Sequence, residues 1–228
     1  MQVVILAGGR GERLRPFTDN IPKPLISIKG KPFLYYQISY LNKYNLKEIV
    51  LCVGYLSEKI IEYFNEHPIP DVKIEFSIEK TPLGTGGALK NAEPMINDEF
   101  ILINGDTYSL LNFSELIEYY YKNYYPVVMT AYDNHEKIAD NNVLVGPNNI
   151  VLAYNKEFSY GMTHVDSGVL VIRKEDFFKN MPDKEKFSFE HEVYPRLIEQ
   201  RKILAYPTTV RFYDIGTPER LKKIEEVI

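Results

Sequence analysis

The sequence is short of several features, and each shortage excludes a class of protein. Its 228 residues include one cysteine, Cys52, which excludes a disulfide framework and a cysteine-rich zinc site and is typical of a reducing cytoplasm. Lysine and arginine number 27 against 31 aspartate and glutamate residues, and this net charge of −4 does not favour nucleic-acid or anionic-membrane partners. No apolar run approaches ~18 residues, and the first residues lack the basic region of a signal peptide. We therefore expect a cytoplasmic protein with no nucleic acid and no membrane among its partners.

The rest of the composition, 45% hydrophobic and 25% charged residues, is that of one folded domain spanning residues 1–228. Apolar runs and alternating segments predict strands over 3–6, 48–53, 72–78, 100–103, 127–131 and 165–172. Helical spacing and helix-start residues predict helices over 32–41, 57–64 (capped by Ser57), 85–92, 113–121, 189–199 and 218–227. This alternation predicts an α/β fold with a mostly parallel sheet covered on both faces. Short β segments are expected at 143–145 and 150–153, and the second half of the chain is interpreted as a subregion that caps the first.

A glycine-rich loop follows the first predicted strand, where open α/β sheets bind their ligands. It reads Gly8-Gly9-Arg10-Gly11-Glu12-Arg13-Leu14-Arg15-Pro16. Glycines let backbone N–H groups approach phosphate oxygens, and Arg13 and Arg15 can add charge-assisted contacts. The loop therefore predicts a phosphate-binding site.

Two other phosphate-binding loops do not match this spacing. A Walker loop requires Gly-Lys-Ser/Thr where Arg13 and Leu14 stand. A dinucleotide fingerprint requires a third glycine in place of Leu14 and a ribose-binding carboxylate after the second strand, which instead ends in Cys52-Val53-Gly54-Tyr55. Both mismatches count against the alternative of an NAD(P)-dependent oxidoreductase.

A single lysine stands between two prolines in Pro22-Lys23-Pro24-Leu25, and the prolines stiffen the chain around it. Such stiffness suits a lysine that is held against a polyphosphate. Together with the glycine loop and Lys31-Pro32, this segment resembles the signature of the sugar-1-phosphate nucleotidylyltransferases, and later motifs extend the similarity to Asp214-Ile215-Gly216-Thr217-Pro218. In appearance the chain is closest to bacterial heptose and mannose 1-phosphate guanylyltransferases.

The resemblance implies a Rossmann-like mixed sheet and the reaction NTP + sugar 1-phosphate → NDP-sugar + pyrophosphate. By the same resemblance, Arg13 holds the triphosphate, Lys23 bridges to the reacting phosphates, and Asp106, delivered by a buried strand, completes the catalytic set. Asp106 and Asp214 are the implied ligands of the cofactor Mg²⁺, which prefers one or two carboxylates plus phosphate and water. No covalent nucleophile is needed, because charge neutralisation and alignment carry phosphoryl transfer.

The resemblance also implies two groups of binding residues. The nucleotide-binding group is Leu6, Ala7, Gly8, Gly9, Gly11, Glu79, Gly84 and Thr85, with Thr85 also a candidate helix cap. The sugar-phosphate-binding group is Gly105, Asn155, Lys156, Asp166 and Gly168. The chain departs from the family at Asn155, where many members carry glutamate, and at Asp166, where many carry asparagine. Both departures concern the sugar, so they leave nucleotidyl transfer intact and the sugar's identity open.

We expect the partners to be an NTP and a sugar 1-phosphate, with GTP and D-glycero-D-manno-heptose 1-phosphate favoured. Uridylyl, thymidylyl and cytidylyl transfer to another sugar 1-phosphate remain alternatives, as does a homo-oligomeric state. A non-catalytic nucleotide-sugar sensor is a further alternative, which the joint presence of Arg13, Lys23, Asp106 and Asp214 disfavours because a sensor has no need of a metal pair.

Overall fold

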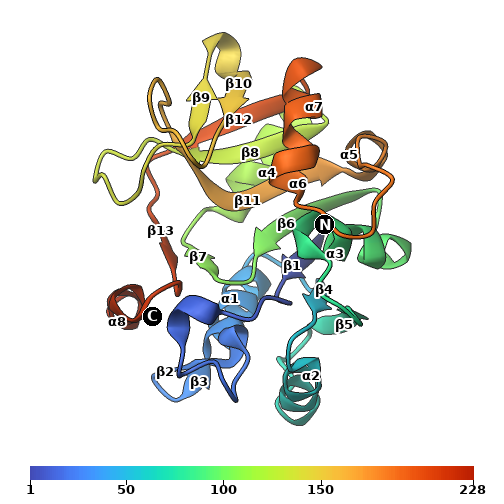
Figure 1. The fold of residues 1–228 in the computed structure, drawn as a ribbon, viewed down its shortest axis with the longest axis vertical. Coiled ribbons are helices and arrows are strands. Elements are labelled where there is room, and N and C mark those ends of the chain that lie inside the picture. The colour runs from blue at the N-terminus through green and yellow to red at the C-terminus, as the bar shows by residue number, and fades with distance from the viewer.

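A seven-stranded sheet forms the centre of the computed structural model, which describes residues 1–228 (Figure 1). Its strand order is β12-β8-β11-β6-β1-β4-β5. The strands are β1 (Gln2–Leu6), β4 (Glu48–Val53), β5 (Lys73–Ile78), β6 (Glu99–Asn104), β8 (Val127–Tyr132), β11 (Val165–Arg173) and β12 (Ile203–Thr208). Only β11 runs antiparallel to its neighbours. The predicted mixed, mostly parallel sheet is therefore confirmed.

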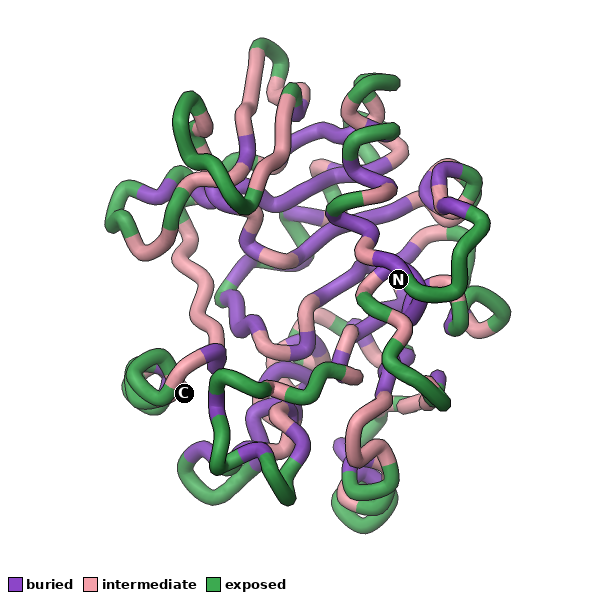
Figure 2. Tube along the Cα trace, in the orientation of Figure 1, coloured by how far each residue is buried: buried purple, intermediate pink, exposed green.

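Helices cover both faces of the sheet, because its central strands carry apolar side chains on both sides. Val3 and Ile5 of β1 pack on the face that also contacts α1 (Phe33–Asn42), α2 (Ser57–Glu66) and α4 (Phe113–Asn123). Val4 packs on the opposite face with α3 (Gly84–Ala92), α6 (Phe189–Glu192) and α7 (Tyr194–Glu199). Figure 2 shows the strands as the buried centre of the molecule. Each large aliphatic side chain buried there contributes ~1.5–3 kcal/mol.

Short elements complete the fold around the sheet. They are the paired strands β2 (Ser27–Ile28) and β3 (Lys31–Pro32), β7 (Thr107–Ser109) and β13 (Phe212–Asp214), β9 (Val143–Val145) and β10 (Val151–Tyr154), with α5 (Lys174–Phe178), α8 (Pro218–Glu225) and four 3₁₀ turns. A small separate core of Ile28, Phe33, Tyr108, Ile215 and Ile224 attaches α8 to the first half of the chain. No helix is long and apolar enough to cross a membrane.

The structure corrects three local predictions. The helix predicted over 189–199 breaks at Val193 into α6 and α7, because Pro195 lacks the N–H that a continuous helix would need. Ser57 is the first residue of α2 rather than its cap, a position taken by Leu56 with φ 52°. Pro32 precedes α1, which begins at Phe33. Strand β12 was not predicted, and Pro207 is tolerated there because β12 is an edge strand whose outer side carries only an isolated bridge at Leu204.

Candidate active site

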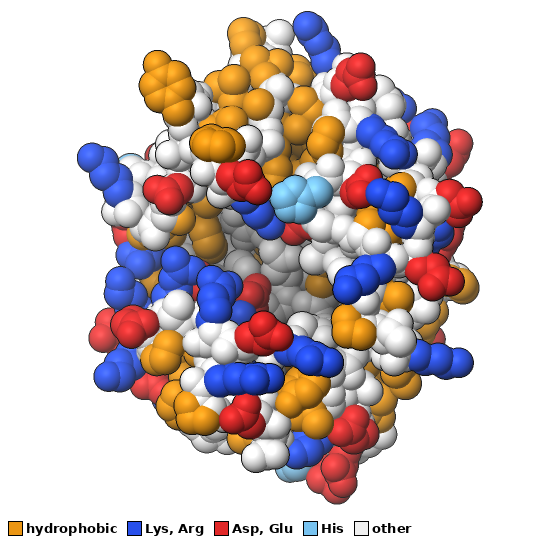
Figure 3. All heavy atoms as spheres, in the orientation of Figure 1, with side chains coloured by type: hydrophobic (Ala, Val, Ile, Leu, Met, Phe, Trp, Pro, Cys, Tyr) orange, Lys and Arg blue, Asp and Glu red, His pale blue; other side chains and the backbone are white.

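A cavity of about 830 Å³ opens at the carboxyl ends of β1, β4, β5 and β6. Figure 3 shows this face hollowed at its centre, with lysine and arginine side chains gathered along the rim. We call this hollow the large cavity. The predicted site residues that line it are Leu6, Ala7, Gly8, Gly9, Gly11, Arg13, Lys23, Glu79, Gly84, Thr85, Gly105, Asp106 and Lys156. Segments far apart in sequence therefore meet around one space of a size typical for small-molecule sites.

The glycine loop forms one wall of the large cavity and is folded against Lys23. Gly11 has φ +63°, and a Cβ there would come within 3.0 Å of the side chains of Lys23 and Thr18. The Thr18 hydroxyl donates to the Gly11 carbonyl oxygen at 3.0 Å, which fixes the turn. Arg13 lines the large cavity, whereas Arg15 pairs with Asp19 at 3.3 Å and is not among the lining residues. Of the two predicted phosphate-binding arginines, only Arg13 thus faces this space.

Lys23 and Asp106 form an ion pair at the wall of the large cavity. The Lys23 ammonium donates to an Asp106 carboxylate oxygen at 2.6 Å, and the side chains are 12% and 37% exposed. Gln37 of α1 supports the turn that carries Asp106, since its amide donates to the carbonyl oxygens of Asn104 at 3.0 Å and Thr107 at 2.6 Å. A buried helix residue thereby anchors a catalytic candidate that lies at the end of β6.

Asp214 lies beside Asp106 although 108 positions separate them in sequence. Strand β13 pairs with β7, which places Asp214 opposite Thr107, and the Ile215 N–H donates to the Asp106 carbonyl oxygen at 3.1 Å. The Asp214 carboxylate accepts from the Gly216 N–H at 2.8 Å and from the Arg220 guanidinium at 2.7 Å. Gly216 lines the large cavity. The fold thus brings the backbone of Asp214 next to that of Asp106, while the Asp214 side chain is not among the residues that line the large cavity.

The donor set around Asp106 and Asp214 fits a magnesium ion. No group of three or more His, Cys, Asp or Glu side chains is arranged to hold a metal, so an ion at Asp106 and Asp214 would need its other ligands from outside these side chains. Mg²⁺ characteristically takes one or two carboxylates and completes its shell with phosphate oxygens and water. Lys23 and Arg220 balance the two carboxylate charges in this structure.

The start of α3 forms the opposite wall of the large cavity, next to Glu79. One Glu79 carboxylate oxygen accepts from the Leu83 N–H at 3.0 Å. Burial raises the pKa of Glu79, and this hydrogen bond opposes the rise. The Thr85 hydroxyl donates to a Glu190 carboxylate oxygen at 2.6 Å and makes no capping bond to α3, so the cap interpretation of Thr85 is wrong.

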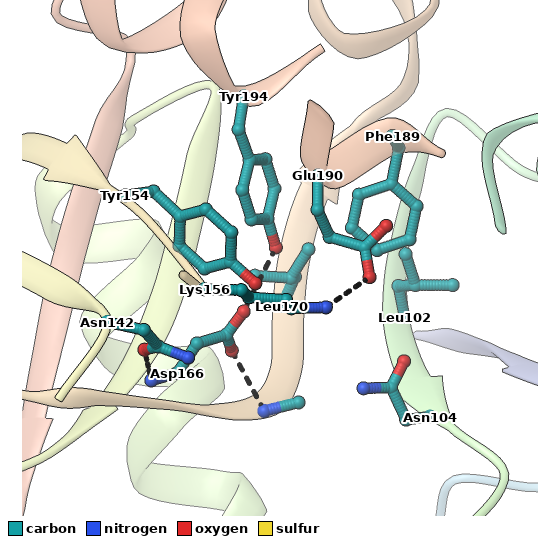
Figure 4. A pocket seen from close by; sticks show the side chains of 11 residues that line it. Leu102, Asn104, Asn142, Tyr154, Lys156, Asp166, Leu170, Phe189, Glu190 and Tyr194 are labelled. Atoms are coloured by element: carbon teal, nitrogen blue, oxygen red, sulfur yellow. Dashed lines mark hydrogen bonds and ion pairs between the residues drawn. The ribbon is translucent and has the colours of Figure 1, made fainter. Parts of the chain in front are cut away.

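A second hollow of about 60 Å³, the small cavity, lies deeper between β11, β10 and α6 (Figure 4). Its lining includes the predicted residues Lys156, Asp166 and Gly168. The Lys156 ammonium contacts a Glu190 carboxylate oxygen at 3.0 Å, and Glu190 is 8% exposed. Burial raises the pKa of Glu190, but the Lys156 charge and the Ser188 and Thr85 hydroxyls outweigh it and hold that pKa below its ordinary range.

Asp166 has the most perturbed carboxyl group of the small cavity. One oxygen accepts from the Gly168 N–H at 2.9 Å, and the other is 3.4 Å from the Tyr194 hydroxyl. Burial raises the pKa of Asp166 to about 6, although the Gly168 N–H and the Lys156 charge oppose the rise. Burial therefore disfavours the charged form of Asp166, and its carboxyl oxygens line the small cavity, where a ligand can reach them.

Asp166→Asn should stabilise the protein at neutral pH. The folded chain binds the Asp166 proton more tightly than the unfolded chain, so wild-type stability falls as pH rises from about 4 to about 6 and stays reduced above it. Removing the charge should recover ~1–3 kcal/mol at pH 7.5 and progressively less towards pH 4. Thermal unfolding of both proteins across this range checks the prediction. A gain that is the same at every pH would contradict it.

Besides Arg15, two predicted residues, Asn155 and Asp214, line neither cavity, and several residues that line or support the cavities were not predicted. Asn155 lines neither cavity, and its side-chain oxygen accepts from the backbone N–H groups of Glu157 and Phe158 at 2.8 and 3.0 Å. The residues missed are Gln37, Asn104, Glu190 and Arg10. Gln37 could have been found from the sequence, because a polar residue on the apolar face of a predicted helix indicates a buried hydrogen-bonding role. Glu190 carried none, because only the fold brings it to Lys156.

Comparison with known proteins identifies the family. Residues 2–139 match the family model described as nucleotidyl transferase. The D-glycero-alpha-D-manno-heptose 1-phosphate guanylyltransferase of Campylobacter jejuni is 34% identical over 219 residues, which cover 96% of both chains. The enzyme of the same name from Aneurinibacillus thermoaerophilus is 31% identical over 229 residues, covering 99% of this chain and 97% of the relative.

Solved structures agree with the sequence relatives. HddC from Yersinia pseudotuberculosis in complex with GMP-PN has a TM-score of 0.82 and 34% identity, with 99% of this chain and 98% of that chain covered. A putative glucose-1-phosphate thymidylyltransferase from Bacillus anthracis, at 16% identity and a TM-score of 0.84, shares the fold. The resemblance noted in the glycine loop and in Pro22-Lys23-Pro24-Leu25 is thereby confirmed, and the chain belongs to the nucleotidyl transferase family.

Proposed function

We propose that the protein transfers a guanylyl group from GTP to a heptose 1-phosphate, giving a GDP-heptose and pyrophosphate. The observation that carries the proposal is that the glycine loop, Arg13, Lys23, Asp106 and Lys156 line one continuous cavity. The near full-length relatives named as heptose 1-phosphate guanylyltransferases support the choice of GTP and heptose. The single free cysteine, Cys52, is buried and suits a reducing compartment, so we place the reaction in the cytoplasm.

The residues of the large cavity bind different parts of the nucleotide. Backbone N–H groups of the glycine loop and the Arg13 guanidinium bind the triphosphate, and Lys23 neutralises charge where the phosphates react. Asp106 and Asp214 would hold Mg²⁺, which supplies further neutralisation of the phosphate oxygens. An oxygen of the sugar phosphate attacks the α-phosphorus of GTP, and the bond to pyrophosphate breaks in line. Catalysis therefore requires mainly that the triphosphate and the sugar phosphate are held together, and Arg13 and Lys23 neutralise their charges.

Different residues recognise the base and the sugar. Glu79 accepts from the Leu83 N–H at the start of α3, and its oxygens can also accept from the exocyclic amino group of guanine, a donor that uracil and thymine lack. Lys156 meets the sugar phosphate, while Asp166 in the small cavity accepts from sugar hydroxyls.

A substrate panel tests the proposal. The protein is incubated with Mg²⁺, each of GTP, UTP, dTTP and CTP, and a set of sugar 1-phosphates that includes D-glycero-α-D-manno-heptose 1-phosphate. Pyrophosphate release should be fastest with GTP and the heptose, with kcat/KM at least ~tenfold above the other nucleotides, as expected when one base edge is read by hydrogen bonds. A preference for UTP, dTTP or CTP would overturn the guanine assignment. No release with any pair, together with retained GTP binding, would favour a sensor.

A further inference from the structure

Three residues line both cavities and therefore stand where they meet: Asn104, Lys156 and Glu190. The Lys156 side chain is 48% exposed, which leaves a long, flexible side chain room for several rotamers. Its one ionic contact is with the Glu190 carboxylate at 3.0 Å, and Figure 4 shows its ammonium pointing to that group. The place of the Lys156 charge thus depends on Glu190.

Glu190 is itself held from the other side. Its second carboxylate oxygen accepts from the hydroxyls of Thr85 and Ser188, each at 2.6 Å. With Lys156 on the first oxygen, both oxygens of this buried carboxylate have partners. A buried charge with its hydrogen bonds complete is fixed in direction as well as in place, because breaking any one bond leaves part of it unsatisfied.

The segment that carries Glu190 is joined to the wall of the large cavity. The Phe187 carbonyl oxygen accepts from the N–H groups of Gly86 and Gly87 at 2.9 and 3.3 Å, and the Phe187 N–H donates to the Leu83 carbonyl oxygen at 3.0 Å. The Phe189 N–H donates to the Thr85 hydroxyl at 3.2 Å. Residues 83–87 and 187–190 therefore form one hydrogen-bonded unit that ends at Lys156.

We propose that Glu190 is a positioning residue: it holds the Lys156 ammonium where the two cavities meet and ties that position to residues 83–87. The inference rests on the proposed function, in which Lys156 meets the sugar phosphate. Without the Glu190 charge, Lys156 spreads over several rotamers and presents no oriented cation. The GTP contacts at the glycine loop and Arg13 are left intact, and residues 83–87 keep their place because the Phe187 backbone still holds them. A carboxylate that merely competed with phosphate for Lys156 would have the opposite effect, since its loss would strengthen sugar-phosphate binding.

Glu190→Gln tests the inference, because glutamine keeps the shape of the side chain and one accepting oxygen, and removes the charge. We expect KM for the sugar 1-phosphate to rise about tenfold and KM for GTP to stay within about twofold, the scale of one charge-assisted hydrogen bond. The matched control is Glu192→Gln on the same helix. Glu192 pairs with Lys184 at 2.7 Å and lines neither cavity, so both KM values should stay at those of the wild type.

The outcomes separate the inference from the proposed function. A wild-type protein that releases no pyrophosphate with any substrate pair overturns the proposed function. With an active wild type, a fall in the sugar 1-phosphate KM of Glu190→Gln shows competition and overturns the inference. An unchanged KM, or an equal rise for both substrates with a lowered unfolding temperature, also overturns it, because a purely structural residue acts on both substrates alike.

Discussion

Asp106→Asn should lower kcat by ~10²–10³, the loss expected when one preorganised charged group is removed from a transition state. The substitution keeps the side-chain volume and leaves an oxygen that can still accept from Lys23, which stands at 2.6 Å in the wild type. What it removes is the charge that Lys23 and the metal both require. The pyrophosphate assay with GTP and heptose 1-phosphate measures the loss.

Two further measurements make the Asp106 result specific. Asp183→Asn is the matched control, since Asp183 is exposed, pairs with Lys90 at 3.8 Å and lies outside both cavities. Its kcat should equal that of the wild type. Binding of Mn²⁺, followed by water relaxation, should weaken in Asp106→Asn alone. An Asp106→Asn variant that keeps wild-type turnover and Mn²⁺ affinity would show that the Asp106 carboxylate takes part in neither catalysis nor metal binding.

Gly87→Ala should destabilise the protein by ~1–3 kcal/mol and impair turnover. A Cβ at Gly87 would overlap the backbone carbonyl oxygen of Glu185 and would come within 2.9 Å of the Leu83 side chain. Alanine is favoured over glycine in a helix by ~1 kcal/mol, so a net loss of stability means that the steric clash exceeds this gain. The clash forces residues 83–87 away from residues 185–187 and disturbs the wall of the large cavity.

Thermal unfolding checks the Gly87 prediction, with a fall of roughly 2–4 °C for each kcal/mol in a chain of this length. Gly9→Ala is the control for stability, because a Cβ at Gly9 has no neighbour within 4 Å. An unfolding temperature for Gly87→Ala at or above that of the wild type would contradict the packing described here.

Local spacing was sufficient to predict that the glycine loop, Arg13 and Lys23 lie together at the large cavity. The glycines, Arg13 and Lys23 lie within a short stretch after one buried strand, and the place of that strand in an α/β sheet follows from its apolar run. Asp106 was predictable for the same reason, as the residue just beyond β6. These patterns are local in sequence, so they can be recognised without knowledge of the fold.

Contacts between distant segments could not be predicted in this way. Glu190 meets Lys156 and Thr85 only because α6 packs against α3, and nothing in the neighbourhood of Glu190 marks it as functional. Asp214 needed the β7–β13 pairing, which the sequence carries only as a short apolar run. Strand β12 was not predicted, and its Pro207 is compatible with a strand only at a sheet edge, a position that the sequence alone does not show.

A crystal structure with a non-hydrolysable GTP analogue and Mg²⁺ tests the central claim most directly. The account predicts the triphosphate on the backbone of residues 8–11 and on Arg13, the guanine beside Glu79 and the start of α3, and the metal at Asp106 and Asp214. A nucleotide bound elsewhere, or one whose phosphates leave Arg13 and Lys23 without contact, would contradict it.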